Sequence, residues 1–139
     1  MSGGALRTGL RGIVTGAARG IGRAMAQRLA ADSIARHGLP ARLVIADQHG
    51  DELETLAGAL RADGATVIAC AGDLCDPAEP ARIVHLARPF GGLDVVASNA
   101  GFARPAPLLH ASVDDWDRVF AVHVRAAWLL GRHLPLTRR

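Results

Sequence analysis

A glycine-rich turn near the N-terminus restricts the fold of this chain more than any other feature. The segment from Thr15 to Gly22 reads TGAARGIG; it follows the short apolar run Ile13-Val14 and opens a helical pattern. A glycine lets another group approach the backbone closely, because it carries no Cβ atom. The first amides of the following helix lack partners inside the helix and attract an anion. This arrangement predicts a site for the pyrophosphate of a dinucleotide. The candidate contacts are Gly16, Arg19, Gly20, Ile21 and Gly22.

Apolar strands and amphipathic helices alternate along the rest of the chain. Apolar runs at 13–14, 43–46, 66–70 and 93–97 indicate buried strands. Apolar spacing predicts helices from about residue 20 into the thirties, over 53–60, from Pro77 to about residue 90, and from Ser112 to Pro135. Successive strand–helix–strand units with right-handed crossovers predict an α/β fold, with a Rossmann-type, doubly wound parallel sheet in the order 3-2-1-4.

Composition and charge argue against several other classes of protein. The 139 residues are 50% hydrophobic and 21% charged, a balance typical of one globular domain. No apolar run approaches the roughly 20 residues that span a membrane, and the N-terminus lacks the apolar core of a secretory signal. We therefore expect a cytoplasmic protein that does not contact membranes. The formal charge is +3, but the arginines are scattered without interleaved aromatic residues, so nucleic acid is not an expected partner.

The cysteines and histidines show no pattern of metal ligands. Cys70 and Cys75 have no second pair, and no His-x-x-x-His spacing occurs. We therefore expect no metal site, and we interpret Cys70 as a small buried hydrophobic residue.

Asp47, which ends the second predicted strand, is a candidate for the selection of the cofactor. A carboxylate at this position can accept hydrogen bonds from the ribose hydroxyls of a dinucleotide. Its charge repels the extra phosphate of NADP, which favours NAD, whereas Arg19 offers that phosphate a cation. Asp47 lies 31 residues after Gly16, so residues 32–40 are interpreted as an insertion between helix and strand. The alternative for Asp47 is a solvated acid without a ligand.

Residues after the third and fourth predicted strands complete the candidate site. Asp73 and its neighbour Leu74 are expected to face the same crevice near the adenine; the alternative for Asp73 is an acid that caps the helix at Pro77. After the fourth strand, Asn99 can tie neighbouring strand ends, while Ala100 and Gly101 leave room for a cofactor. Asn and Gly also form ordinary turns, so these three residues alone are a weak signal.

Together these residues resemble the short-chain dehydrogenase/reductase family, from about Arg11 to Leu130. Thr15-Gly16-x-x-x-Gly20-x-Gly22 is similar to the cofactor motif of that family, and Asn99-Ala100-Gly101 to its Asn-Ala-Gly motif. Trp116-x-x-x-Phe120-x-Val122 resembles the start of its long fifth helix. Asp47 and Asp73 fall where the family places ribose and adenine contacts. The resemblance implies hydride transfer between NAD, or less favourably NADP, and an alcohol or carbonyl substrate, and it allows a homo-oligomer.

The catalytic residues that the resemblance implies cannot be placed in this chain. The family uses a Ser, a Tyr and a Lys beyond the fifth helix and an Asn within it, but this chain contains no Tyr or Lys and stops at Arg139. His123 stands at the position of the helix Asn. It shares an apolar helix face with Trp116 and Phe120, so we expect a packed core histidine.

We therefore expect the N-terminal portion of an oxidoreductase, truncated after about four strands and the fifth helix and inactive alone. Its parts are a flexible lead over 1–10, an incomplete dinucleotide-binding domain over 11–134 and a tail over 135–139. One alternative is a dinucleotide-binding module without catalysis. Another is a remnant that pairs with a second chain through the open edge of the strand at 93–97. A methyltransferase of similar topology is disfavoured, because the glycine spacing suits a pyrophosphate.

Overall fold

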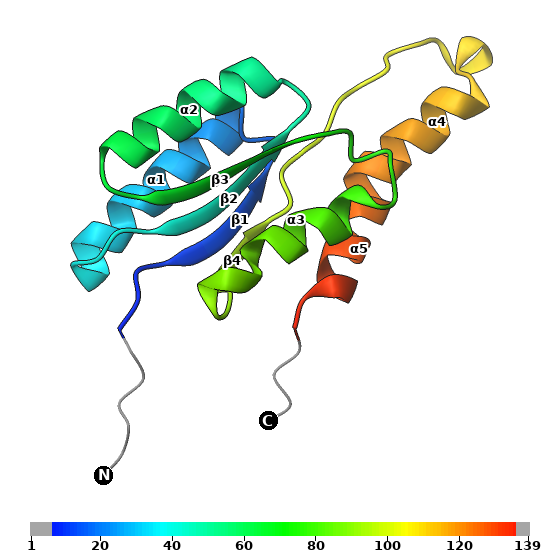
Figure 1. Cartoon of the computed structure of the whole chain (residues 1–139). Helices are drawn as coiled ribbons and strands as arrows, with labels where there is room; N and C mark the ends of the chain where they lie inside the picture. The colour runs from blue at the N-terminus through cyan, green and yellow to red at the C-terminus, as the bar shows by residue number, and fades with distance from the viewer. Residues whose placement is uncertain (1–6, 136–139) are drawn as a thin grey trace.

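The computed structural model describes residues 7–135, in which four strands alternate with helices (Figure 1). The first half comprises β1 (Arg11–Thr15), α1 (Gly20–His37), β2 (Arg42–Asp47), α2 (Gly50–Ala62) and β3 (Thr66–Ala71). The second half comprises α3 (Glu79–Ala87), the 3-10 turn η1 (Arg88–Phe90), β4 (Val95–Ala97), the 3-10 turn η2 (Leu108–His110), α4 (Val113–Phe120), the π-helical segment η3 (Ala121–Arg125) and α5 (Ala126–His133). Residues 1–6 of the expected lead and 136–139 of the expected tail lie outside the described residues.

The four strands form one parallel sheet in the order β3-β2-β1-β4, which confirms the expected α/β topology. The order reverses at β1, because the chain adds β2 and β3 on one side of it and β4 on the other. Val14 of β1 is in register with Ala97 of β4, so the carboxyl ends of these two strands lie side by side. Within residues 7–135, β4 is an edge strand that pairs only with β1, and its pairing begins at Val95, not at residue 93.

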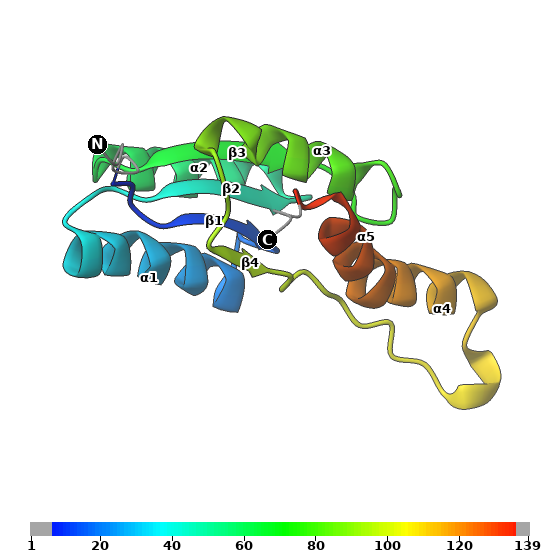
Figure 2. The same ribbon diagram turned by 90° about the horizontal axis from the view of Figure 1, so that it is seen from below.

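Alternate residues of each strand pack on opposite faces of the sheet. Val14, Leu43 and Ile45 belong to the core beneath α1 and α2, whereas Ile13 and Val44 belong to the core beneath α3 and α5. Figures 1 and 2 show these two helix pairs on opposite sides of the strands. Both faces are therefore apolar, which is why the strands read as continuous apolar runs. Each fully buried Ile or Leu contributes about 1.5–3 kcal/mol through burial. Cys70 is 2% exposed and belongs to the core beneath α3 and α5, as expected for a small buried hydrophobic residue.

Helix α1 runs from Gly20 into the thirties, as the sequence pattern predicts. It continues to His37 and ends at Gly38, whose φ of +66° is a left-handed helix cap. Interpreting residues 32–40 as an insertion between helix and strand was therefore wrong for residues 32–37, which extend the helix. Met25 and Leu29 pack against the core as their spacing predicts, but Ile21 is 74% exposed.

The long C-terminal helix buries only part of its predicted apolar face, since Leu130 is buried but Trp116 and Phe120 are exposed. Ser112 caps α4 as expected, since its Oγ accepts a hydrogen bond from the Asp115 amide at 3.0 Å. The buried residues lie further along the helix, namely Ala121, Val122, Ala126 and Leu130. Trp116 and Phe120 are 63% and 46% exposed and stack on one another. The reason is that α4 extends beyond the sheet, where residues 7–135 provide no core for it (Figure 1).

None of the helices within residues 7–135 combines the length and the apolar character that a membrane span requires.

Ser33 of α1 provides a test of the packing between the chain start and the helix. Its side chain is fully buried; Oγ accepts from the Leu10 amide at 2.9 Å and donates to the Leu39 carbonyl at 2.6 Å. Ser33→Ala is expected to lower the free energy of unfolding by about 1–3 kcal/mol, because two backbone groups lose their partner. Thr55→Ala removes an exposed helix hydroxyl bonded to Asp51 and should change stability by less than about 0.5 kcal/mol. Urea denaturation measures the free energy of unfolding of both variants. Equal losses of stability in the two variants would contradict a structural role for the buried Ser33 hydroxyl.

Candidate functional site

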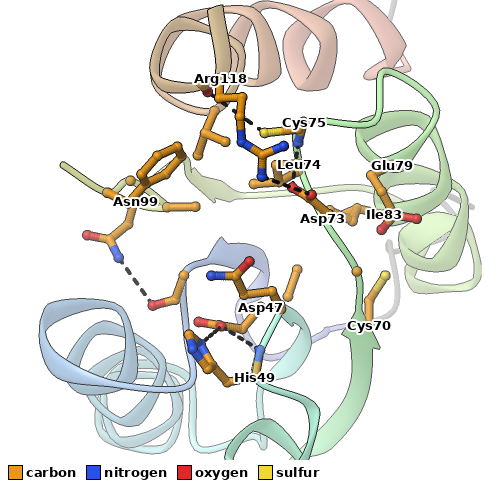
Figure 3. Close-up of a pocket in the computed structure, with 18 of the residues that line it drawn as sticks. Asp47, His49, Cys70, Asp73, Leu74, Cys75, Glu79, Ile83, Asn99 and Arg118 are labelled. Carbon is orange, nitrogen blue, oxygen red and sulfur yellow. Dashed lines mark hydrogen bonds and ion pairs between the residues drawn. The ribbon is translucent and has the colours of Figure 1, made fainter. Parts of the chain in front are cut away.

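A cleft of about 470 Å³ opens where the strands end. Segments that follow all four strands contribute to its wall, because the carboxyl ends of parallel strands meet at one edge of the sheet (Figure 3). Most of the predicted contacts line it: Gly16, Arg19, Asp47, Asp73, Leu74, Asn99, Ala100 and Gly101. The other predicted contacts, Gly20, Ile21 and Gly22, form the first turn of α1 directly after Gly16 and Arg19.

Thr15 and Asn99 join the two strand ends at the centre of this edge. Thr15 is fully buried, and its Oγ1 accepts hydrogen bonds from the amides of Asn99 and Ala100, each at 3.1 Å. The Asn99 side-chain amide donates to the carbonyls of Thr15 at 3.3 Å and Gly16 at 3.4 Å. The expectation that Asn99 ties neighbouring strand ends is confirmed. The role of Thr15 was missed, because a threonine at the end of a strand gives no distinctive signal in the sequence.

The three glycines of the turn meet different requirements. Gly16 has a φ of +67°, and a Cβ on it would lie 2.8 Å from the Ala100 Cα. A Cβ on Gly22 would lie 2.0 Å from the Gly16 carbonyl oxygen, so the first turn of α1 packs directly on the glycine turn. Gly20 has a φ of +55°, but a Cβ there would meet nothing within 4 Å. Gly16 and Gly22 therefore serve close packing, whereas Gly20 serves backbone conformation beside open space.

The N-terminus of α1 is open to an anion. Arg19, at the N-cap position, makes no side-chain capping hydrogen bond, and the first turn contains no acidic residue. The first amides of a helix carry a partial positive charge and lack partners within the helix. No side-chain capping hydrogen bond offsets that charge within the helix.

The Asp47 carboxylate is held in place by hydrogen bonds, and its side chain is only 11% exposed. One oxygen accepts from the Ala18 amide at 3.0 Å; the other accepts from the His49 amide at 2.9 Å and contacts His49 Nδ1 at 2.8 Å (Figure 3). Burial opposes ionisation, but the hydrogen bonds from His49 and Ala18 outweigh it, so the pKa of Asp47 lies below its ordinary value. The interpretation of Asp47 as a freely solvated acid is wrong. His49 was missed, although an Asp two residues earlier is the pattern of an Asx-turn.

Arg19 is engaged by an acid of the next helix. Its Nε donates to Glu52 Oε2 at 2.6 Å, and its Nη2 contacts Glu52 Oε1. Glu52 lies in the first turn of α2, 33 residues away in the chain. From the sequence, Arg19 was interpreted as a cation available to a phosphate, because no feature near Arg19 in the chain indicates Glu52 as its partner.

Asp73 organises the loop after β3 and does not cap α3. Its Oδ1 accepts from the Cys75 amide at 2.9 Å, and its Oδ2 lies 3.9 Å from Arg118 Nη2 (Figure 3). Helix α3 begins only at Glu79, and the acid that bonds the amide just before it is Asp76. Arg118, which brings α4 to the cleft, was not a predicted residue. Within residues 7–135, no group of three or more His, Cys, Asp or Glu side chains could hold a metal ion.

His123 is exposed, so the expectation of a packed core histidine is wrong. It lies in the π-helical segment η3, and its Nε2 lies 3.0 Å from the Phe102 amide and 2.9 Å from the Phe102 carbonyl. The tautomer decides which of these is the hydrogen bond. A Cβ on Gly101 would lie 2.3 Å from the His123 ring. Gly101 therefore leaves room for His123, which holds the loop after β4 against the long helix.

Comparison with known proteins identifies relatives for nearly all of the described residues. A model of the short chain dehydrogenase family matches residues 12–135. The short-chain dehydrogenase/reductase eriH of Hericium erinaceus is 39% identical over 124 residues, which cover 87% of this chain and 47% of that protein. This chain spans about half the length of that relative.

Two solved structures show the same fold with a nicotinamide dinucleotide. A short chain dehydrogenase/reductase from Burkholderia phymatum in complex with NAD has a TM-score of 0.79 and 31% identity over 91% of this chain and 43% of its own. L-Sorbose reductase from Gluconobacter frateurii, complexed with NADPH and L-sorbose, has a TM-score of 0.81 and 29% identity over 91% of this chain and 46% of its own. With its parallel sheet in the order β3-β2-β1-β4, the chain belongs to the short-chain dehydrogenase/reductase family.

Proposed function

We propose that this chain binds NAD as the dinucleotide-binding portion of an oxidoreductase that moves hydride between the cofactor and an alcohol or carbonyl. One observation carries this proposal: the uncapped, acid-free N-terminus of α1, with open space at Gly20, adjoins a cleft that contains the held carboxylate of Asp47. Anion attraction and hydrogen-bond acceptance are the two properties that a pyrophosphate joined to a ribose requires.

The residues of the cleft fit the parts of such a cofactor. The first amides of α1 would hold the pyrophosphate, and Asp47 would accept from the ribose hydroxyls. Asp73 and Leu74 would border the adenine. Exposed Ile21 offers apolar contact, and the loop at 99–101 would lie towards the nicotinamide half. When bound, the dinucleotide accepts or supplies the hydride; the residues of this chain hold and orient it.

NAD is favoured over NADP by two features of the ribose corner. Asp47 stays ionised at neutral pH because its pKa is depressed, so it opposes the 2′-phosphate of NADP. Arg19, which would attract that phosphate, is already paired with Glu52. The family itself uses both cofactors, as the complexes with NAD and NADPH illustrate. The preference therefore rests on these local charges.

Gly20 and Gly38 form a matched pair that tests the pyrophosphate site. They lie at opposite ends of α1, each with a positive φ and with nothing within 4 Å of an added Cβ. Alanine at either position should cost about 1–2 kcal/mol of stability through the same backbone strain. Only Gly20→Ala should weaken NADH binding, by about tenfold or more, because its methyl group occupies the approach to the α1 amides. Fluorescence titration with NADH measures the effect. Equal NADH affinities for the two variants would contradict a pyrophosphate site at the N-terminus of α1.

Asp47→Asn tests the ribose contact and its electrostatics. The variant should bind NADH more weakly and lose about 1–2 kcal/mol of stability at pH 7, because hydrogen bonds to a charged acceptor become neutral ones. The pKa of Asp47 is lower in the folded protein than in the unfolded chain, where it is about 4. Ionised Asp47 therefore stabilises the fold fully above the unfolded pKa, and this contribution is lost as the pH falls through the folded pKa. The stability gap between wild type and variant should therefore narrow as the pH falls from about 5 through the folded pKa of Asp47. A gap that is constant with pH would contradict a held carboxylate.

Turnover tests the catalytic part of the proposal. Assayed alone with NAD and a panel of secondary alcohols, the 139-residue chain should form no NADH, because it contains no Tyr or Lys to act as the family's acid–base pair. Absorbance at the NADH band provides the measurement. Steady turnover that disappears in Gly20→Ala would show that this chain carries its own catalytic group.

A further inference from the structure

The corner of the cleft between the glycine turn and α2 contains two pairs of acidic and basic side chains. Asp47 pairs with His49 at 2.8 Å, and Arg19 pairs with Glu52. Glu52 is two residues past the start of α2 at Gly50, which places it close to the end of β2. Arg19 lines the cleft, and its side chain is 60% exposed, so its charge is within reach of a ligand.

We infer that Glu52 determines the choice of cofactor by holding Arg19 and so withholding that guanidinium from the 2′-phosphate of NADP. This inference rests on the proposed function, since it requires a dinucleotide whose adenosine ribose lies at Asp47. Glu52 is a positioning residue in this scheme: it acts on the cofactor through Arg19.

The geometry of the pair supports this role. Two nitrogens of the Arg19 guanidinium face the two Glu52 oxygens, which is the bidentate arrangement that a phosphate would otherwise take. The hydrogen bond from Arg19 outweighs the smaller effect of burial and lowers the pKa of Glu52, so Glu52 is ionised at neutral pH. A 2′-phosphate must therefore compete with a carboxylate that is already in place.

The charge balance of the corner points the same way. Arg19 contributes one positive charge, whereas Glu52 and Asp47 contribute one negative charge each, so these three residues oppose a dianionic phosphate. Without the Glu52 charge, Arg19 would balance Asp47 and keep an unshared guanidinium. An exposed ion pair contributes little to stability, so neutral substitution of Glu52 should leave the fold intact.

The test compares Glu52→Gln with Glu54→Gln in the 139-residue chain. Glu54 lies on the same helix and is also exposed, but its partner is Arg61 of α2, at 3.6 Å. The readout is the ratio of the dissociation constants for NADPH and NADH, obtained by fluorescence titration of the same preparation. A partial loss of folded protein therefore cancels. We expect the ratio to fall roughly tenfold in Glu52→Gln, as for one charged contact regained, and to stay unchanged in Glu54→Gln.

A double variant, Arg19→Ala with Glu52→Gln, separates release of Arg19 from simple loss of a negative charge. The proposal requires that the gain for NADPH disappear in the double variant. If the ratio still falls there, long-range charge sets the preference and the inference is overturned. An unchanged ratio in Glu52→Gln, with NADH still bound, overturns the inference alone. Failure of the wild-type chain to bind either dinucleotide overturns the proposed function as well.

Discussion

The hydroxyl of Thr15 connects the two strands between which the cleft opens. It is fully buried and accepts hydrogen bonds from the amides of Asn99 and Ala100 at the end of β4. The side-chain amide of Asn99 in turn donates hydrogen bonds to the carbonyls of Thr15 and Gly16. These bonds join segments 84 residues apart and set how far the loop after β4 stands from α1. The glycine turn and residues 99–101, which line opposite ends of this link, both border the cleft.

The missing Cβ atoms of the turn are the second constraint. Gly22 lets α1 pack against the carbonyl of Gly16, and Gly16 lets the turn pass the backbone of Ala100. The helix consequently starts close to the strand end, beside Gly16 and Arg19, which line the cleft. Gly20 contributes in a different way, through a left-handed φ with open space beside it. Within one motif, Gly16 and Gly22 thus allow close packing, whereas Gly20 leaves space open at the start of α1.

The charges around the cleft are mostly paired within the protein. Asp47 pairs with His49, Arg19 with Glu52, and Asp73 approaches Arg118. A ligand in this cleft must therefore compete with contacts that already exist, and its affinity depends on what those contacts release.

The sequence by itself determined the element order, the sheet topology, the glycine turn and the position of most predicted contacts at one edge. These follow from local periodicity and from the steric freedom of glycine, which act over a few residues. Only the tertiary structure decided that Arg19 is held by Glu52, that His123 is exposed against Phe102, and that α4 leaves Trp116 uncovered. Each of these depends on which surfaces meet across long separations in the chain. Helical spacing marks an apolar face, but it carries no information about whether another element lies opposite that face.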